Sequence, residues 1–280
     1  MVYRKDDRFM DVYRKAKGIY DEIVQTKAFL ESNLKKAETF IIEAVKRGSN
    51  IICFPEMWTT GFNWTNNEKI AKDQNKTIEK ISQLAKQNKI WINGSVLALN
   101  EKGKVANTSL LFNADGKIVG TYRKTHLFTL LKEDKHMAPG ESLCAVKAPW
   151  GSTGLSICYD VRFPEMFRTY ALNGVQIVLM PMAFPYPRLA HLRTLIRARA
   201  IENQMFMVGI NQVGEEDYGA DGKVTYFGSS CIIDPWGETV VEASQDKEEL
   251  LTATIDTSMS DEIRNKMHVL KDRRPDLYFK

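Results

Sequence analysis

The chain has 280 residues, of which 44% are hydrophobic and 26% charged, so it can fill the core of one large domain or of two small ones. Lysine and arginine outnumber aspartate and glutamate by 39 to 35, a mild and scattered excess that favours neither a nucleic-acid nor a membrane partner. The N-terminus has no signal-peptide core and no apolar run approaches membrane-spanning length, which predicts a cytoplasmic protein.

The N-terminal part of the chain is predicted to contain an extension, a helix and a buried strand. Residues 1–19 are charged with little apolar pattern, which indicates a polar extension ahead of a domain that covers residues 20–280. Within residues 28–47 apolar side chains recur every three or four positions, as on one face of a helix, and Gly48 is a natural stop. Residues 50–54 then form a short apolar strand that ends at a proline.

The rest of the chain alternates strands with helices. A pattern of helix, glycine, apolar strand and proline occurs twice with the same spacing, from Gly48 to Pro55 and from Gly174 to Pro181. Two such halves with no linker-like tract between them predict a single α/β domain, built as a four-layer α-β-β-α sandwich. The predicted strands are 91–99, 107–112, 117–123, 152–157, 175–180, 205–211, 229–234, 239–242 and 250–256, and the predicted helices are 164–172 and 188–203.

The cysteines and glycines give no sign of a cofactor. Cys53, Cys144, Cys158 and Cys231 form no C-x-x-C pair, and none has a histidine at metal-binding spacing. A metal is therefore not expected, and reduced thiols fit a cytosolic protein. The glycines form no phosphate-cradling loop, so we expect no nucleotide cofactor either.

Three polar residues follow predicted strands, and each has an ordinary structural interpretation when taken alone. Glu56 could be a turn carboxylate, Lys124 a solvated residue at a strand end, and Cys158 a small buried hydrophobic residue. Strand ends at one edge of a sandwich can converge on one pocket, however. Covalent acyl transfer needs a thiol, a base that takes its proton and a cation for the oxyanion, and these three side chains supply that set.

The segments around these residues resemble the three signatures of the nitrilase superfamily, the carbon–nitrogen hydrolases. They are Phe-Pro-Glu ending at Glu56, Tyr-Arg-Lys ending at Lys124, and Cys-Tyr-Asp-Val-Arg-Phe-Pro-Glu starting at Cys158, in a match that spans residues 23–278. The resemblance implies a Glu-Lys-Cys triad of these three residues. It also implies a second glutamate at Glu133, with Asp134 as the weaker candidate, and an oxyanion hole of Lys124 and the backbone N–H of Tyr159.

Further segments resemble the ω-amidase branch of that superfamily. They are residues 55–62, 124–128, 197–204 and 273–278. The resemblance implies hydrolysis of the terminal amide of a small carboxylate-bearing substrate such as 2-oxoglutaramate, with water, a thioester intermediate and release of ammonia. A nitrilase or an N-carbamoyl amine hydrolase with the same triad remains an alternative. So does a binding protein of this fold without turnover.

The resemblance also guides the interpretation of neighbouring residues. Residues 20–26 must fill the place of the family's first strand, although Asp21 and Glu22 would weaken a central strand. Asp160 and Arg162 are expected to pair and shape the turn after Cys158, and His126 to pack or form hydrogen bonds rather than catalyse. A homodimer or a higher homo-oligomer is expected, through helices beside the site and C-terminal tails. The predicted substrate-binding residues are Phe62, Phe184, Arg188 and His191.

Overall fold

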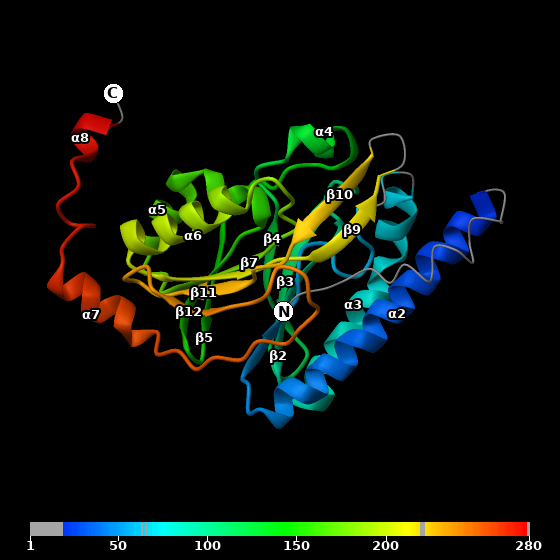
Figure 1. Ribbon diagram of the computed structural model, residues 1–280, viewed down its shortest axis with the longest axis horizontal. Helices are drawn as coiled ribbons and strands as arrows, with labels where there is room; N and C mark the ends of the chain where they lie inside the picture. Colours follow the sequence, from blue (N-terminus) through cyan, green and yellow to red (C-terminus); the bar gives the residue numbers. More distant parts are fainter. Residues whose placement is uncertain (1–18, 63, 65, 219–221, 279–280) are drawn as a thin grey trace.

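Two β-sheets lie face to face between two pairs of helices in the computed structural model, which describes residues 19–62, 64, 66–218 and 222–278 (Figure 1). The first sheet has the order β1-β2-β3-β4, with β1 parallel to β2 and the other neighbours antiparallel. Helices α2 and α3 cover its outer face. These elements are α2 (Ile19–Lys46), β1 (Ile51–Cys53), α3 (Asn67–Asn88), β2 (Trp91–Leu99), β3 (Val105–Phe112) and β4 (Ile118–Arg123).

The second sheet has the order β12-β11-β8-β7-β6-β5, with a parallel centre of β6, β7 and β8. Helices α5 and α6 cover its outer face. These elements are β5 (Cys144–Ala148), β6 (Gly151–Leu155), α5 (Pro164–Leu172), β7 (Ile177–Pro181), α6 (Leu189–Asn203), β8 (Phe206–Ile210), β11 (Cys231–Ile233) and β12 (Thr239–Glu242).

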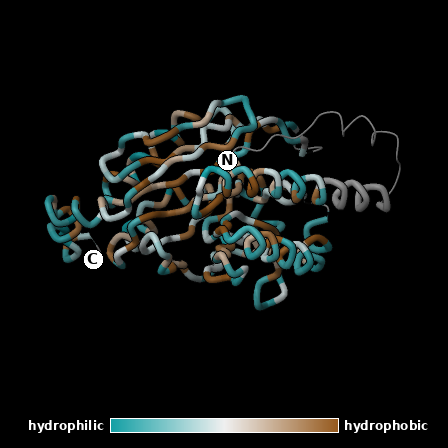
Figure 2. Tube along the Cα trace, turned by 90° about the horizontal axis from the view of Figure 1, so that it is seen from below, coloured by the Kyte–Doolittle hydropathy of each residue, from teal (hydrophilic) through white to brown (hydrophobic). Residues whose placement is uncertain are grey.

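Apolar residues hold the four layers together. Leu34 and Ile41 of α2 share one buried cluster with Ile92 of β2 on the outer side of the first sheet. A second cluster joins the facing sheets to α5 and α6. Figure 2 shows the corresponding pattern, with hydrophobic residues along the inner strands and hydrophilic ones along the outer helices. The sheets approach closely at Gly120, where an added Cβ would lie 2.8 Å from Val146 Cγ2.

The shorter elements lie around one end of the sheets or beyond the layers. They are η1 (Thr129–Leu131), α4 (Glu133–His136), η2 (Cys158–Arg162), the antiparallel hairpin of β9 (Val213–Asp217) and β10 (Lys223–Phe227), α7 (Ser258–Lys266) and α8 (Pro275–Tyr278). Figure 1 shows α8 standing apart from the four layers. No helix in the described ranges combines the length and the apolar character needed to cross a membrane.

The four-layer prediction is confirmed, but two of the predicted strands are wrong. Residues 20–26 belong to α2, because the helical spacing of apolar residues extends back from Leu30 to Ile23 and the segment continues the rest of that helix without a break. Residues 250–256 form no strand. Residues 1–18, most of the predicted extension, lie outside the described residues. The sequence analysis did not identify α3, β5, the β9–β10 hairpin, α7 or α8.

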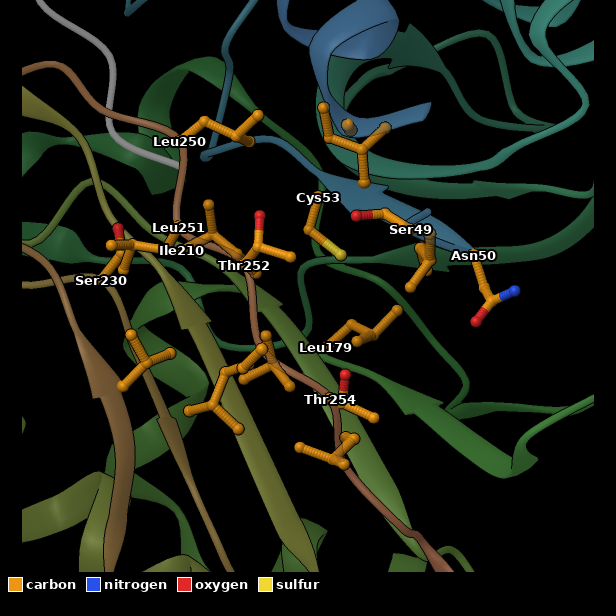
Figure 3. A pocket seen from close by; sticks show the side chains of 18 of the residues that line it. Ser49, Asn50, Cys53, Leu179, Ile210, Ser230, Leu250, Leu251, Thr252 and Thr254 are labelled. Carbon is orange, nitrogen blue, oxygen red and sulfur yellow. The ribbon is translucent and has the colours of Figure 1, made fainter. Parts of the chain in front are cut away.

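Because residues 20–26 are helical and residues 250–256 form no strand, a groove lies open beside β1. The hydrogen bonds from Trp91 N–H to Asn50 O and from Phe54 N–H to Asn93 O fix the parallel pattern with β2, so the N–H and C=O groups of Ile51 and Cys53 point to the other edge. No described residue bonds to them there. A cavity of about 250 Å³ separates this edge from the segment 250–255, and Cys53 and Leu179 line it (Figure 3).

Candidate active site

Glu56 lies in a sharp turn after β1, where neighbouring segments hold its backbone. The next residue, Met57, has a positive φ of 51°, and its N–H donates to Ser95 Oγ at 2.8 Å. The carbonyl of Glu56 accepts a hydrogen bond from Gln212 Nε2 at 2.6 Å. The Glu56 side chain is fully buried, so its carboxylate needs partners inside the protein.

Lys124 and Glu133 supply part of that environment. Lys124 follows β4, and its Nζ donates to Glu56 Oε1 at 2.8 Å and to Glu133 Oε1 at 2.7 Å. Glu133 begins α4, and its second oxygen accepts the N–H of Phe128 at 2.8 Å. Because all three side chains are at most 2% exposed, one ammonium lies between two carboxylates in a nearly water-free cluster.

Asn107 of β3 makes the two oxygens of Glu56 unequal. Its Nδ2 donates to Glu56 Oε1 at 2.8 Å, the same oxygen that receives Lys124. The other oxygen, Oε2, is buried and receives no hydrogen bond from any described residue. That oxygen is therefore the one available to take a proton.

Cys158 opens the turn η2, shortly after β6. Its φ of 44° lies in the left-handed region, which is strained for a residue with a side chain. The Asp160 carboxylate accepts the N–H of Ile157 at 2.8 Å, and the carbonyl of Val161 accepts Arg199 Nε at 2.9 Å. These bonds hold the turn. Near the start of this turn, the backbone N–H of Tyr159 has no acceptor among the described residues.

The pKa values of Cys158, Lys124 and Glu133 are all shifted by this environment. Burial, and then the charge of Glu56, raise the pKa of the Cys158 thiol well above its ordinary value, although Lys124 opposes the shift. Burial alone would lower the pKa of Lys124, but the charges of Glu133 and Glu56 outweigh it and raise that pKa. Burial also raises the pKa of Glu133. The resting state therefore has a charged lysine and a protonated thiol.

Aromatic rings and two arginines lie next to the turn that carries Cys158, through contacts with Tyr159. The rings of Phe128 and Tyr159 lie with centroids 4.9 Å apart, and the Arg188 guanidinium lies over Phe128 at 5.6 Å. The Arg162 guanidinium lies over Tyr159 at 5.9 Å and over Phe184 at 5.5 Å. Cations on ring faces near a nucleophile can recognise an anionic part of a substrate.

The hairpin of β9 and β10 packs against the segment that follows Glu56. Tyr218 follows β9, and burial, then Glu216 and, more weakly, Glu56 and Glu133 raise its pKa, so its phenol lies within electrostatic reach of the cluster. Its ring contacts Phe62 with centroids 6.1 Å apart. Glu216 Oε1 accepts the N–H of Phe62 at 3.1 Å. An added Cβ at Gly61, which has a φ of 64°, would lie 2.3 Å from that oxygen, so the hairpin and the segment after Glu56 are tightly joined.

The structure brings together the residues predicted to be catalytic, namely Glu56, Lys124, Glu133 and Cys158. Asp134, the weaker candidate for the second glutamate position, instead lies 3.2 Å from exposed Lys135. Of the predicted substrate-binding residues, Phe184 lies in the buried cluster that contains Cys158, Arg188 lies over Phe128, and Phe62 contacts Tyr218. His191 is exposed, and its Nδ1 lies 3.4 Å from Arg162 Nη2.

The predicted pair of Asp160 and Arg162 is wrong. Asp160 Oδ1 lies 2.7 Å from His126 Nδ1 instead, and Arg162 lies on aromatic rings. The sequence analysis missed Asn107, Gln212 and the β9–β10 hairpin. A signal for Asn107 was present, because an amide within an otherwise apolar strand must find a hydrogen-bond partner when the strand is buried. Within the described ranges no three His, Cys, Asp or Glu side chains are grouped as metal ligands.

Comparisons with known proteins agree with this geometry. A family model described as carbon-nitrogen hydrolase matches residues 23–265. The 2-oxoglutaramate amidase of Bacillus subtilis (strain 168) is 35% identical over 252 residues, which cover 88% of this chain and 93% of that protein. Omega-amidase NIT2 of Mus musculus is 33% identical over 91% of this chain and 94% of its own length. A carbon-nitrogen hydrolase structure from Helicobacter pylori G27 superposes with a TM-score of 0.82 at 26% identity, covering 89% of this chain and 92% of that one.

Proposed function

The chain belongs to the carbon–nitrogen hydrolase family, and on that premise we propose that it is an ω-amidase, which removes the terminal amide of a small carboxylate-bearing substrate. Family membership confirms the resemblance of the sequence signatures to the nitrilase superfamily and makes the chain a hydrolase of carbon–nitrogen bonds in amides. The relatives' names suggest 2-oxoglutaramate as the test substrate. One observation carries the proposal, namely the buried cluster around Cys158 with two arginines on the neighbouring rings.

In the proposed acylation, Glu56 takes the thiol proton of Cys158 on its free oxygen while the sulfur attacks the amide carbon. The raised thiol pKa supports this order, because the proton leaves during the attack rather than before it. Lys124 Nζ and the N–H of Tyr159 stabilise the oxyanion. Glu56 then gives its proton to the leaving nitrogen, ammonia departs, and the acyl group remains on sulfur as a thioester.

Deacylation reverses the roles with water. Glu56 takes a proton from a water that attacks the thioester carbon, and Glu133 orients that water or holds Lys124 in place through the 2.7 Å contact. Collapse of the second oxyanion releases the acid, and Glu56 returns the proton to Cys158. Water enters and no electrons are transferred, so the reaction balances as amide plus water to carboxylate and ammonium.

Recognition of the substrate's distant carboxylate falls to Arg162 and Arg188 in this proposal. With two carboxylates and one ammonium, the catalytic cluster carries no surplus positive charge that could attract an anion. The guanidinium groups over Phe128, Tyr159 and Phe184 supply that charge at the approach to Cys158. Arginine suits the task because its planar fork binds a carboxylate in two places.

Ammonia release tests this function. The purified protein should act faster on 2-oxoglutaramate than on an aliphatic nitrile or an N-carbamoyl amino acid, and Arg162→Met should raise KM far more than it lowers kcat. Arg193→Met is the matched control, because Arg193 lies on the exposed part of α6 and pairs with Glu242. Faster turnover of the nitrile or the carbamoyl compound would contradict the proposal, as would no turnover of any of the three.

We also infer that the protein is a homodimer in a reducing compartment such as the cytosol. On the C-terminal arm, defined here as residues 267–278, Met267, Leu277 and Tyr278 are exposed by 45%, 54% and 57%. Leu172 of α5 and Ile201 of α6 each expose 48% on the body. Burying such side chains against a second copy would be favourable. The four free cysteines fit the compartment.

A further inference from the structure

The buried carboxylate of Asp160 joins the turn that carries Cys158 to the segment that carries Lys124. On the side of the turn, its Oδ2 accepts the N–H of Ile157 at 2.8 Å. On the other side, the same oxygen accepts the hydroxyl of Tyr122 at 2.7 Å. Its Oδ1 accepts the backbone N–H of His126 at 3.3 Å and lies 2.7 Å from His126 Nδ1. Asp160 is fully buried, so each of these donors offsets part of the cost of burying its charge.

This tie matters because the backbone at Cys158 is strained. Cys158 keeps a φ of 44°, a left-handed conformation that is costly for a residue with a side chain. The bond from Ile157 N–H to Asp160 closes the turn just before the cysteine. If Asp160 lost the donor that holds Oδ1 most closely, the remaining donors would fix the carboxylate less firmly, and the turn would shift with it and carry the sulfur away from Glu56 and Lys124.

His126 is the donor of this set whose side chain can be exchanged without emptying the core. An ionised carboxylate only accepts, so Nδ1 must carry the hydrogen in the 2.7 Å contact. The ring is stacked on Phe163 at 3.7 Å with planes 7° apart, and the side chain is 27% exposed. Phe163 ends the turn that begins at Cys158, so His126 contacts this turn at two residues, Asp160 and Phe163.

We infer that His126 is a positioning residue for the reaction proposed above: its Nδ1–H, through Asp160, holds the Cys158 turn in register with the Lys124 segment. The inference rests on the proposed function. His126 touches none of the reacting atoms, so its loss should change the rate of chemistry and leave substrate binding nearly unchanged. The stack on Phe163 alone would not give that result, and this separates the donor from a purely packing role.

Two substitutions at position 126 separate the donor from the ring. His126→Phe keeps a ring for the stack on Phe163 and removes the Nδ1–H donor. His126→Asn removes the ring and places an amide N–H near the position of Nδ1. We expect His126→Phe to lower kcat by about 10- to 100-fold, with KM close to that of the parent. We expect His126→Asn to recover most of the loss. His268→Phe is the matched control, because His268 is exposed and, among the described residues, its ring contacts Asn265 O of the same loop.

Amide hydrogen exchange at Ile157 gives a second reading that does not need turnover. Exchange should be faster in His126→Phe than in the parent and close to the parent in His126→Asn. Parent-like kcat and exchange in His126→Phe would overturn the inference, and so would equal losses in both variants. If the parent has no amidase activity, the proposed function fails, and the exchange data still decide the role of His126. If His126→Phe does not fold, His126→Leu replaces it with the same expectations.

Discussion

Lys124 is the residue whose charge the rest of the cluster depends on. It is 1% exposed and lies 2.8 Å from Glu56 and 2.7 Å from Glu133. Lys124→Met keeps most of the side-chain volume but leaves two buried carboxylates without their cation. We expect the free energy of unfolding to fall by about 3–5 kcal/mol, as for other broken buried pairs, and amide hydrolysis to fall by about 10²–10³-fold. Urea unfolding and ammonia release measure the two effects.

A lysine close in sequence controls for the loss of one positive charge. Lys135 is 73% exposed beside Asp134, so Lys135→Met should leave both stability and activity nearly unchanged. Equal behaviour of the two variants would mean that Lys124 is not held as a buried cation.

Glu56→Gln should separate thiol ionisation from catalysis. Glu56 is the second cause, after burial, of the raised pKa of Cys158, and a neutral amide removes the repulsion between the carboxylate and the thiolate. The thiol pKa should therefore fall, so that thiolate forms at a lower pH than in the parent. Hydrolysis should nevertheless fall by about 10²–10⁴-fold, because the proton acceptor is gone. Thiolate ultraviolet absorbance, with Cys158→Ser as the blank, follows the titration. A midpoint at or above that of the parent would contradict the assigned cause.

At the residue scale, contiguous motifs could be recognised in the sequence and long-range partners could not. Glu56, Lys124 and Cys158 each stand in a short run of characteristic residues at the end of a strand. Asn107 reaches Glu56 across 51 positions, and His126 reaches Asp160 across 34. Such contacts depend on how strands and turns are juxtaposed, which local spacing does not encode. For the same reason the adjacent Asp160 and Arg162 were wrongly paired.

At the scale of elements, β1 is an edge strand that pairs with β2 on one side only. Ile52 and Phe54 donate to β2, whereas Ile51 and Cys53 face the groove of Figure 3 without a bond to any described residue. We expect the amides of Ile51 and Cys53 to exchange hydrogen much faster than those of Ile52 and Phe54. Site-resolved exchange measures this alternation. Because the four amides lie in one short segment, local unfolding affects them all alike and differences between them report their hydrogen bonds. Uniform protection along β1 would show that another segment occupies the groove.

Elements with strong local periodicity were predictable, and those that depend on neighbours were not. The apolar strands at 91–99 and 107–112 and the C-terminal end of α2 were predicted close to their observed bounds, whereas α2 begins at Ile19, nine residues before its predicted start. Residues 20–26 carry both a weak strand pattern and a helical spacing, and continuity with the rest of α2 favours the helix. Residues 250–256 have strand-like composition but no partner strand beside them among the described residues, and composition alone does not make a sheet.

At the scale of the whole molecule, the C-terminal arm should govern assembly. Removing residues 267–278 deletes three of the most exposed large apolar side chains and leaves the four layers intact. We expect the full chain to be a dimer and the shortened chain to be more dissociated, as measured by light scattering during size-exclusion chromatography. Leu130→Ser is the control, because Leu130 is 72% exposed but lies far from the arm in sequence, at η1. A full chain that is monomeric at all concentrations would contradict the expectation.

The architecture of the whole molecule followed from the sequence more readily than its edges did. The repeated order of helix, glycine, strand and proline reflects two halves that each bury one sheet face under helices. It therefore predicts the layers independently of the residues at the edges of the fold. The groove beside β1, the arm and the β9–β10 hairpin lie at the rim. Their placement depends on a few contacts, such as Glu216 with Phe62, that carry no periodic signal.

The most direct test of the account is to trap the acyl group on sulfur. The parent protein is mixed with 2-oxoglutaramate, quenched in acid within the first turnovers and digested for mass spectrometry. We predict an acyl adduct on the peptide that contains Cys158, lost on treatment with hydroxylamine, and neither adduct nor ammonia from Cys158→Ala. Ammonia release from Cys158→Ala at the parent's rate, or steady turnover by the parent with the adduct on a different residue, would contradict the account.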